Sequence, residues 1–223
     1  DALDNSQIDV AILEIYGMFY EEDDSGFTSE GVRDSSLNDF RYSDIKTEAI
    51  RDCVPEELQK EYFFPLDKYH TRWEDLEYSS LSGLKESLIN RYYEEDGRGF
   101  KHWSGAQECG YASWDTIFSE KRRDVFKGNL EYLERIYKEC KTHGTRLILI
   151  KAPFPCYERT VEMTNTVMDW ADEHDVELIN CMKVTDVIGL DFGVDSLDGG
   201  THLNESGGRK VSRYIAEYLK SIM

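Results

Sequence analysis

The sequence is short of basic residues and contains no basic cluster. It has 26 Lys and Arg residues against 45 Asp and Glu residues, which gives a formal net charge of -19. Nucleic acids and anionic membrane surfaces attract proteins through clustered Lys and Arg side chains. The composition therefore argues against nucleic acid as a partner. The excess of acidic residues is explained most simply by solubility.

Cysteine is also scarce, and none of the five cysteines belongs to a Cys-x-x-Cys pair. This argues against a zinc cage and against a dense disulfide framework. Cys140 and Cys181 occupy apolar positions and are predicted to be small core residues. The other three cysteines leave room for one disulfide.

Long hydrophobic runs are missing, so the sequence shows neither a membrane span nor a signal peptide. Internal repeats and low-complexity tracts are also missing. Residues 1–5 resemble the tail of a helix, which is compatible with an ectodomain whose leader has been removed.

Three apolar runs are predicted to be buried parallel strands, at 10–16, 146–152 and 176–180. The middle run is almost continuous in Leu and Ile, which is typical of a strand covered on both faces. Helical spacing of apolar residues predicts helices over 119–143 and 157–173 and at the C-terminus, with Val211 and Ile215 on one face. The alternation of helix and strand predicts an α/β fold with a parallel sheet.

The stretch 21–118 is polar and rich in aromatic residues, and we interpret it as an inserted subdomain within a single α/β domain of residues 1–223. It lies between the first two predicted strands. Short helices are expected at 43–53, 55–62 and 84–93, and an extended loop at 97–105. Insertions beside strand ends often determine the specificity of α/β enzymes.

The segment Asp198-Gly-Gly-Thr-His202-Leu-Asn-Glu-Ser-Gly207 places a carboxylate and an imidazole on one short loop. A carboxylate on one ring nitrogen fixes the tautomer of a histidine, and the other nitrogen can then take a proton from a hydroxyl. The alternative is that Asp198 and Asn204 only form turn and cap hydrogen bonds, with His202 incidental. On the loop alone, neither interpretation is favoured.

This block, with the amphipathic helix after it, resembles the last conserved block of SGNH/GDSL hydrolases, which carries the Asp and His of a Ser-His-Asp triad. The resemblance implies a three-layer α/β/α, flavodoxin-like parallel sheet. It is nearest to bacterial cell-surface proteins, often lipoproteins, related to families that serve alginate acetylation and D-alanylation of teichoic acids. Residues 64–73 also resemble that subgroup. The resemblance further implies an extracellular or cell-surface location with an anchor upstream, and a membrane-bound acyltransferase as a partner.

The chain departs from this family at two places. The loop reads Asp-x-x-x-His rather than Asp-x-x-His, so Asp195 competes with Asp198 as the partner of His202, and proximity favours Asp198. The nucleophile motifs Gly-Asp-Ser and Gly-x-Ser-x-Gly do not occur. Three serines lie near Gly or Asp without following a hydrophobic strand: Ser25, Ser104 and Ser196. By the resemblance, the first strand with its serine precedes this chain, which would leave a gap or an exposed edge in the sheet.

Four further residues are candidates for substrate contacts. By the family analogy Gly17, after the first predicted strand, would offer its N–H to an oxyanion, whereas a simple strand-ending glycine is the favoured explanation. In an extended segment His70 and Arg72 share a face and could hold an anionic group, whereas an ion pair of Arg72 with a nearby acid is the simpler alternative. Lys151 ends the middle strand and could meet an anionic substrate, with a carboxylate partner as the alternative.

Two functions therefore compete. The first is a serine esterase or O-acyltransferase acting on an acylated glycan or small ester, which needs no metal or organic cofactor. The second is a non-catalytic binding or assembly module of the same fold. A carbohydrate-binding surface built on Trp73, Trp103 and Trp114 is a third possibility. The oligomeric state stays open.

Overall fold

The computed structural model describes residues 2–20, 30–37, 40–64, 104–107, 119–154, 157–199 and 202–222. The chain forms two compact units, one of Asp1–Tyr20 with Lys101–Met223 and one of Glu21–Phe100. The second unit begins at the same residue as the predicted insertion, and it ends at Phe100 rather than at 118. The helix expected at 84–93 lies outside the described residues.

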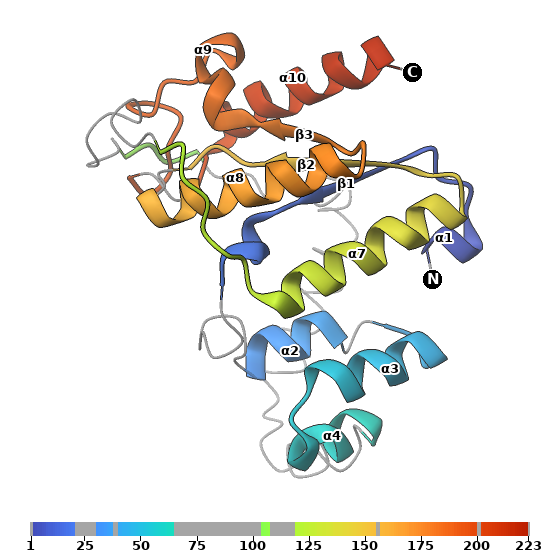
Figure 1. Cartoon of the computed structure of the whole chain (residues 1–223). Helices are drawn as coiled ribbons and strands as arrows, with labels where there is room; N and C mark the ends of the chain where they lie inside the picture. The colour runs from blue at the N-terminus through green and yellow to red at the C-terminus, as the bar shows by residue number, and fades with distance from the viewer. Residues whose placement is uncertain are drawn as a thin grey trace, which may run out of the picture. The chain divides into compact units, whose positions relative to one another are not determined.

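In its described part the larger unit is built on a parallel sheet of three strands, as the sequence predicts, and the strands lie in the order β1-β2-β3 (Figure 1). The strands are β1 (Val10–Glu14), β2 (Arg146–Lys151) and β3 (Glu177–Asn180). The resemblance predicts a gap or an exposed edge in the sheet. No gap separates the described strands, because β1 pairs directly with β2. In the described sheet β1 is an end strand, and Ile12 at its centre is 45% exposed.

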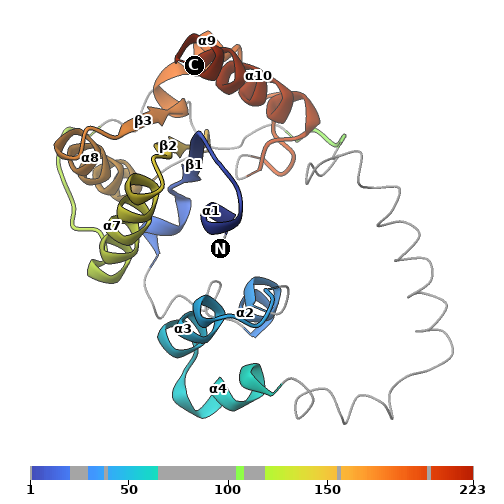
Figure 2. The ribbon, with the colours of Figure 1, turned by 90° about the vertical axis from the view of Figure 1, so that its right-hand side faces the viewer.

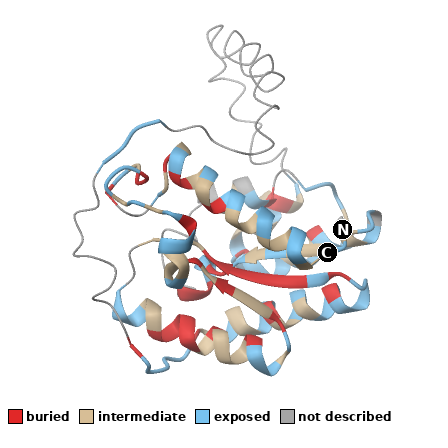
Figure 3. Cartoon of the chain, turned by 90° about the horizontal axis from the view of Figure 1, so that it is seen from above, coloured by how far each residue is buried: buried red, intermediate tan, exposed pale blue. Residues whose placement is uncertain are grey.

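Helices cover both faces of this sheet. Successive side chains of β2 point to opposite faces, and both sets are buried. Leu147 and Leu149 point into a core cluster with α7 (Lys127–Thr142) and α8 (Glu158–Glu173). Ile148 and Ile150 point into a second cluster with α10 (Glu205–Ile222). Figure 2 shows α7 and α8 on one side of the strands and α10 on the other. Figure 3 shows buried residues along the strands between these helices, and all residues of β2 except Arg146 are buried.

The remaining elements of this unit are short. They are α1 (Ala2–Asn5), the 3-10 turns η1 (Tyr16–Phe19) and η5 (Cys181–Val184), and α9 (Thr185–Ile188). Cys140 and Cys181 are both buried in the core, as predicted. Burial raises the pKa of the Cys181 thiol to about 11, so this thiol is an inert core group. Among the described helices, none has the length and apolar content to cross a membrane.

The smaller unit contains three helices in its described part: α2 (Glu30–Leu37), α3 (Asp44–Cys53) and α4 (Glu56–Phe63). Ser43 caps α3 by accepting a hydrogen bond from the Lys46 main-chain N–H at 3.1 Å. A small core of Leu37, Ile50, Val54 and Tyr62 joins the three helices. The Tyr62 hydroxyl also donates to Asp34 of α2 at 2.9 Å. The helices predicted at 43–53 and 55–62 are therefore present within one residue at each end.

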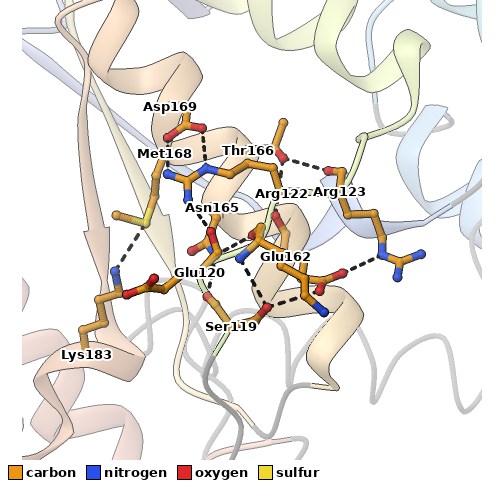
Figure 4. Close-up of polar contacts among 11 residues, drawn as sticks. Ser119, Glu120, Arg122, Arg123, Glu162, Asn165, Thr166, Met168, Asp169 and Lys183 are labelled. Atoms are coloured by element: carbon orange, nitrogen blue, oxygen red, sulfur yellow. Dashed lines mark hydrogen bonds and ion pairs between the residues drawn. The ribbon is translucent and has the colours of Figure 1, made fainter.

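The prediction of one helix over 119–143 is wrong at its beginning. Helix α7 starts at Lys127, and residues 119–126 run without helix along α8. The Asn165 amide donates to the carbonyls of Ser119 at 2.8 Å and Lys121 at 2.9 Å, and Thr166 donates to the Arg123 carbonyl at 2.7 Å. Side chains of α8 therefore take carbonyls that a helix would have used (Figure 4). We call residues 119–125 the strap.

Two ion pairs fasten the strap to α8 as well. Arg122 binds Asp169 through two nitrogens, each 2.7 Å from a carboxylate oxygen. The Arg123 Nε lies 3.0 Å from Oε2 of Glu162, whose side chain is only 6% exposed. The hydrogen bond from Arg123 holds the pKa of Glu162 below its ordinary value, and Arg122 does the same for the pKa of Asp169. Both carboxylates are thus matched to cations of the strap.

Asn165→Ala is expected to destabilise the protein by about 2 kcal/mol, because it removes two hydrogen bonds and leaves the buried Ser119 carbonyl without its donor. Urea unfolding monitored by circular dichroism measures the change. Glu173→Ala at the exposed end of the same helix is the control, and it should change stability by no more than about 0.5 kcal/mol. Equal effects of the two substitutions would contradict this account of the strap.

Candidate functional site

The Asp198–His202 loop lies at the end of the sheet toward which the strands point. It connects α9 to α10, and in Figure 1 this connection lies beyond the carboxyl ends of β2 and β3. In parallel α/β sheets, ligands bind at this edge because the loops there are free to vary while the strands hold them in place. The location is therefore suited to an active site.

A short hairpin presents the two side chains. Ser196 and Leu203 form an isolated antiparallel bridge, and the Leu197 N–H donates to the His202 carbonyl at 2.9 Å. Gly199 adopts a φ of 81°, in the left-handed region that favours glycine, and so lets the chain reverse. We call residues 195–204 the hairpin.

Asp198 contacts His202 twice. Its Oδ2 lies 2.6 Å from the ring Nδ1, and its Oδ1 accepts the His202 main-chain N–H at 2.9 Å. An ionised carboxylate only accepts hydrogen bonds, so Nδ1 is the donor when it contacts the ionised form of Asp198, and the neutral form of the ring then accepts a proton at Nε2. The His202 side chain is 64% exposed and that of Asp198 is 36% exposed. This arrangement can orient a general base on a side chain that is largely exposed to solvent.

Asp195, the competing partner, has a different role in the structure. Its side chain is fully buried, and its Oδ2 accepts from Lys210 Nζ at 2.6 Å and from the Asp191 N–H at 2.8 Å. Burial alone would raise the pKa of Asp195, but the Asp191 amide and Lys210 outweigh it and keep this pKa below the ordinary value. Of the two aspartates, Asp198 is therefore the one that contacts the ring of His202.

Leu203 and Asn204 anchor the end of the hairpin. Leu203 packs against the core cluster under α10. Asn204 caps α10 by accepting the Gly207 N–H at 3.1 Å, and its amide donates to the carbonyls of Val194 at 2.7 Å and Gly105 at 3.0 Å. The cap hydrogen bonds and the Asp198–His202 contact thus occur together, although the sequence presents them as alternatives.

Residues 104–107 lie directly beside the hairpin, which the sequence did not reveal. Besides the contact of Gly105 with Asn204, the Gln107 N–H donates to the Ser196 carbonyl at 3.0 Å. A side chain on Gly105 would press on Leu197, since its Cβ would lie 3.2 Å from the Leu197 Cδ1. The partners are about ninety residues apart in sequence, and no local pattern signals such a pairing.

The serines considered as nucleophiles differ in their placement. Ser196 is 1% exposed, so its hydroxyl is closed to a substrate. Ser104 is exposed in the segment beside the hairpin. Ser25 lies outside the described residues.

Gly17 lies in η1, immediately after β1, and its carbonyl accepts a hydrogen bond from Asn129 at 3.3 Å. A Cβ at this position would meet no described atom within 4 Å, so packing does not require glycine there. The oxyanion role of Gly17 stays a prediction. No pattern in the sequence points to the neighbouring Glu14. Its carboxylate accepts the N–H groups of Tyr16 at 2.6 Å and Ala152 at 3.1 Å and so joins the turns after β1 and β2.

Lys151 ends β2, as predicted, but its side chain is only 1% exposed. Its Nζ donates to the Ala152 carbonyl at 3.0 Å and lies 3.3 Å from the centre of the Phe154 ring. An anionic substrate would have to displace Phe154 to reach this ammonium, so the substrate contact of Lys151 stays a prediction. His70 and Arg72 lie outside the described residues, as do the three tryptophans proposed as a carbohydrate surface.

Within the described ranges, no group of three or more His, Cys, Asp and Glu side chains is placed to hold a metal ion. His143 and His174 are the C-cap residues of α7 and α8. The pair of Asp198 and His202 is thus the part of the described chain best arranged for acid–base chemistry.

Comparison of the chain with models of known protein families, with curated proteins and with solved structures finds no match. The functional assignment therefore depends on the hairpin and on the resemblance of its sequence.

Proposed function

We propose that this chain supplies the acid–base pair of an SGNH-type serine esterase or O-acyltransferase that acts on acyl groups of cell-surface polysaccharide. The observation that carries the proposal is the 2.6 Å contact between Asp198 and the largely exposed His202 side chain, held on the hairpin at the carboxyl end of a parallel sheet. Helices on both faces of that sheet support the finer assignment to a three-layer, flavodoxin-like fold.

In the proposed mechanism, a serine hydroxyl attacks the ester carbonyl while His202 Nε2 accepts the hydroxyl proton. Asp198 holds Nδ1–H and stabilises the imidazolium that results. The tetrahedral intermediate collapses to an acyl-enzyme, and the leaving alkoxide takes the proton from Nε2. Water or a sugar hydroxyl then attacks the acyl-enzyme with His202 again as base, which regenerates the serine. The step needs no cofactor.

A non-catalytic binding or assembly module is the second candidate. It is favoured by the sequence itself, which contains neither Gly-Asp-Ser nor Gly-x-Ser-x-Gly in the printed residues. In that case the chain would hold an acylated glycan, or a membrane-bound acyltransferase, at the cell surface without chemistry of its own.

The two candidates are separated by labelling the complete product of the gene with a fluorophosphonate probe, which reacts with activated serines. We expect labelling of the native protein and its loss in His202→Ala, because the serine then lacks its base. Mass spectrometry of the labelled peptide would identify the serine. Absence of labelling in the native protein, with no hydrolysis of p-nitrophenyl acetate, would sink the enzyme proposal and leave the binding module.

A further inference from the structure

The hairpin that carries Asp198 and His202 is fixed to α10 at its base. Asp195 opens the hairpin, and its main-chain carbonyl accepts the N–H of Asn204 at the other end at 2.9 Å. Helix α10 approaches so closely that a Cβ on Gly207 would lie 2.6 Å from the same carbonyl. The base of the hairpin is therefore in direct main-chain contact with the first turn of the helix.

One ion pair joins these two elements through side chains. Lys210 of α10 reaches Asp195 Oδ2 at 2.6 Å, and the carboxylate is fully buried. A buried carboxylate is strongly destabilised when its cation is removed, whereas an intact pair fixes the groups around it. The ion pair therefore opposes any displacement of the hairpin along α10.

We propose that Asp195, through Lys210, is a positioning residue that keeps His202 in the Nδ1–H tautomer against Asp198. This inference rests on the proposed function, because the tautomer matters only if His202 is a base. Neither residue touches the reacting atoms. When the base of the hairpin loosens, the ring of His202 leaves Asp198 for part of the time. A free imidazole in water favours the Nε2–H tautomer, which cannot accept a proton at Nε2.

Lys210→Met tests the proposal, with Arg209→Met as a matched control. The neighbouring residue Arg209 has its partner Glu205 on its own helix at 2.7 Å, so its loss removes an equal charge without touching the hairpin. The ¹⁵N shifts of the His202 ring report the tautomer and need no substrate. We expect a shift toward Nε2–H in Lys210→Met, none in Arg209→Met, and recovery in Lys210→Arg. Asp195→Asn keeps the shape of the buried side chain and serves if Lys210→Met does not fold.

The kinetics should follow the tautomer. For p-nitrophenyl acetate we expect kcat of Lys210→Met to fall about tenfold with KM unchanged, since the change affects the base and not substrate binding. A native-like tautomer ratio in both Lys210→Met and Asp195→Asn would overturn the inference while leaving the esterase proposal intact. The opposite outcome is also distinguishable. If the native protein hydrolyses no ester, the esterase proposal is refuted. If the tautomer shift is still confined to the Lys210 and Asp195 variants, the positioning role is supported.

Discussion

His202→Ala is expected to lower kcat/KM for p-nitrophenyl acetate by about a thousandfold. The substitution removes the nitrogen that takes the nucleophile's proton, and the rest of the hairpin keeps its main-chain hydrogen bonds. Because the His202 side chain is 64% exposed, its truncation leaves no cavity in the core. The loss should therefore appear in activity and leave the urea midpoint almost unchanged. The loss of activity is measured by steady-state hydrolysis with the complete gene product, in which the release of p-nitrophenol is followed by its absorbance.

His143→Ala is the matched control for this experiment. His143 caps α7 and its Nε2 lies 3.5 Å from Asp4, at the amino end of the strands. Removal of the His143 side chain should leave kcat/KM within about twofold of the native value, because this residue is remote from the hairpin.

Asp198→Asn should lower kcat/KM about a hundredfold, since the amide can face the ring in an orientation that favours the wrong tautomer of His202. If His202→Ala kept most of the native activity, hydrolysis would have to come from another group and the acid–base assignment would fail.

The elements that the sequence predicts well are those whose signal is local. Periodic apolar residues in α8 and the nearly continuous run of β2 both become the expected elements, because each pattern reports burial along its own segment. The contact of Asp198 with His202, which the sequence offers as one of two alternatives, also depends on a local signal. Its two residues lie on one short loop, where Gly199 allows the reversal that brings them together.

The features that the sequence did not predict depend on residues far apart in the chain. The strap is not helical because Asn165 and Thr166 of α8 bind its carbonyls. The sequence of residues 119–125 contains no signal that predicts these contacts. The role of Asp195 likewise depends on its partner Lys210, which lies 15 residues further along the chain in α10. Residues 104–107 join the hairpin through Asn204, which follows Gly105 by 99 residues in the sequence. In each case a tertiary hydrogen bond outweighs the local preference.

The pair of Ile12 and Ile148 offers the second large effect. The two residues are register partners on β1 and β2, so their side chains point to the same face of the sheet. Ile148 is fully buried in the cluster under α10, whereas Ile12 is 45% exposed. The same substitution at the two positions therefore compares a filled core with a sheet edge while residue type, strand direction and face stay constant.

Ile148→Ala is expected to lower the free energy of unfolding by about 3 kcal/mol, because it removes buried methyl groups and leaves a cavity between β2 and α10. Ile12→Ala should cost about 1 kcal/mol or less, since much of its side chain already meets water. Urea unfolding at several protein concentrations measures both. A cost at Ile12 as large as that at Ile148 would contradict an open edge. If that cost also grew with protein concentration, it would show that another chain covers β1 in solution, because a partner that buries an apolar edge strand binds by mass action.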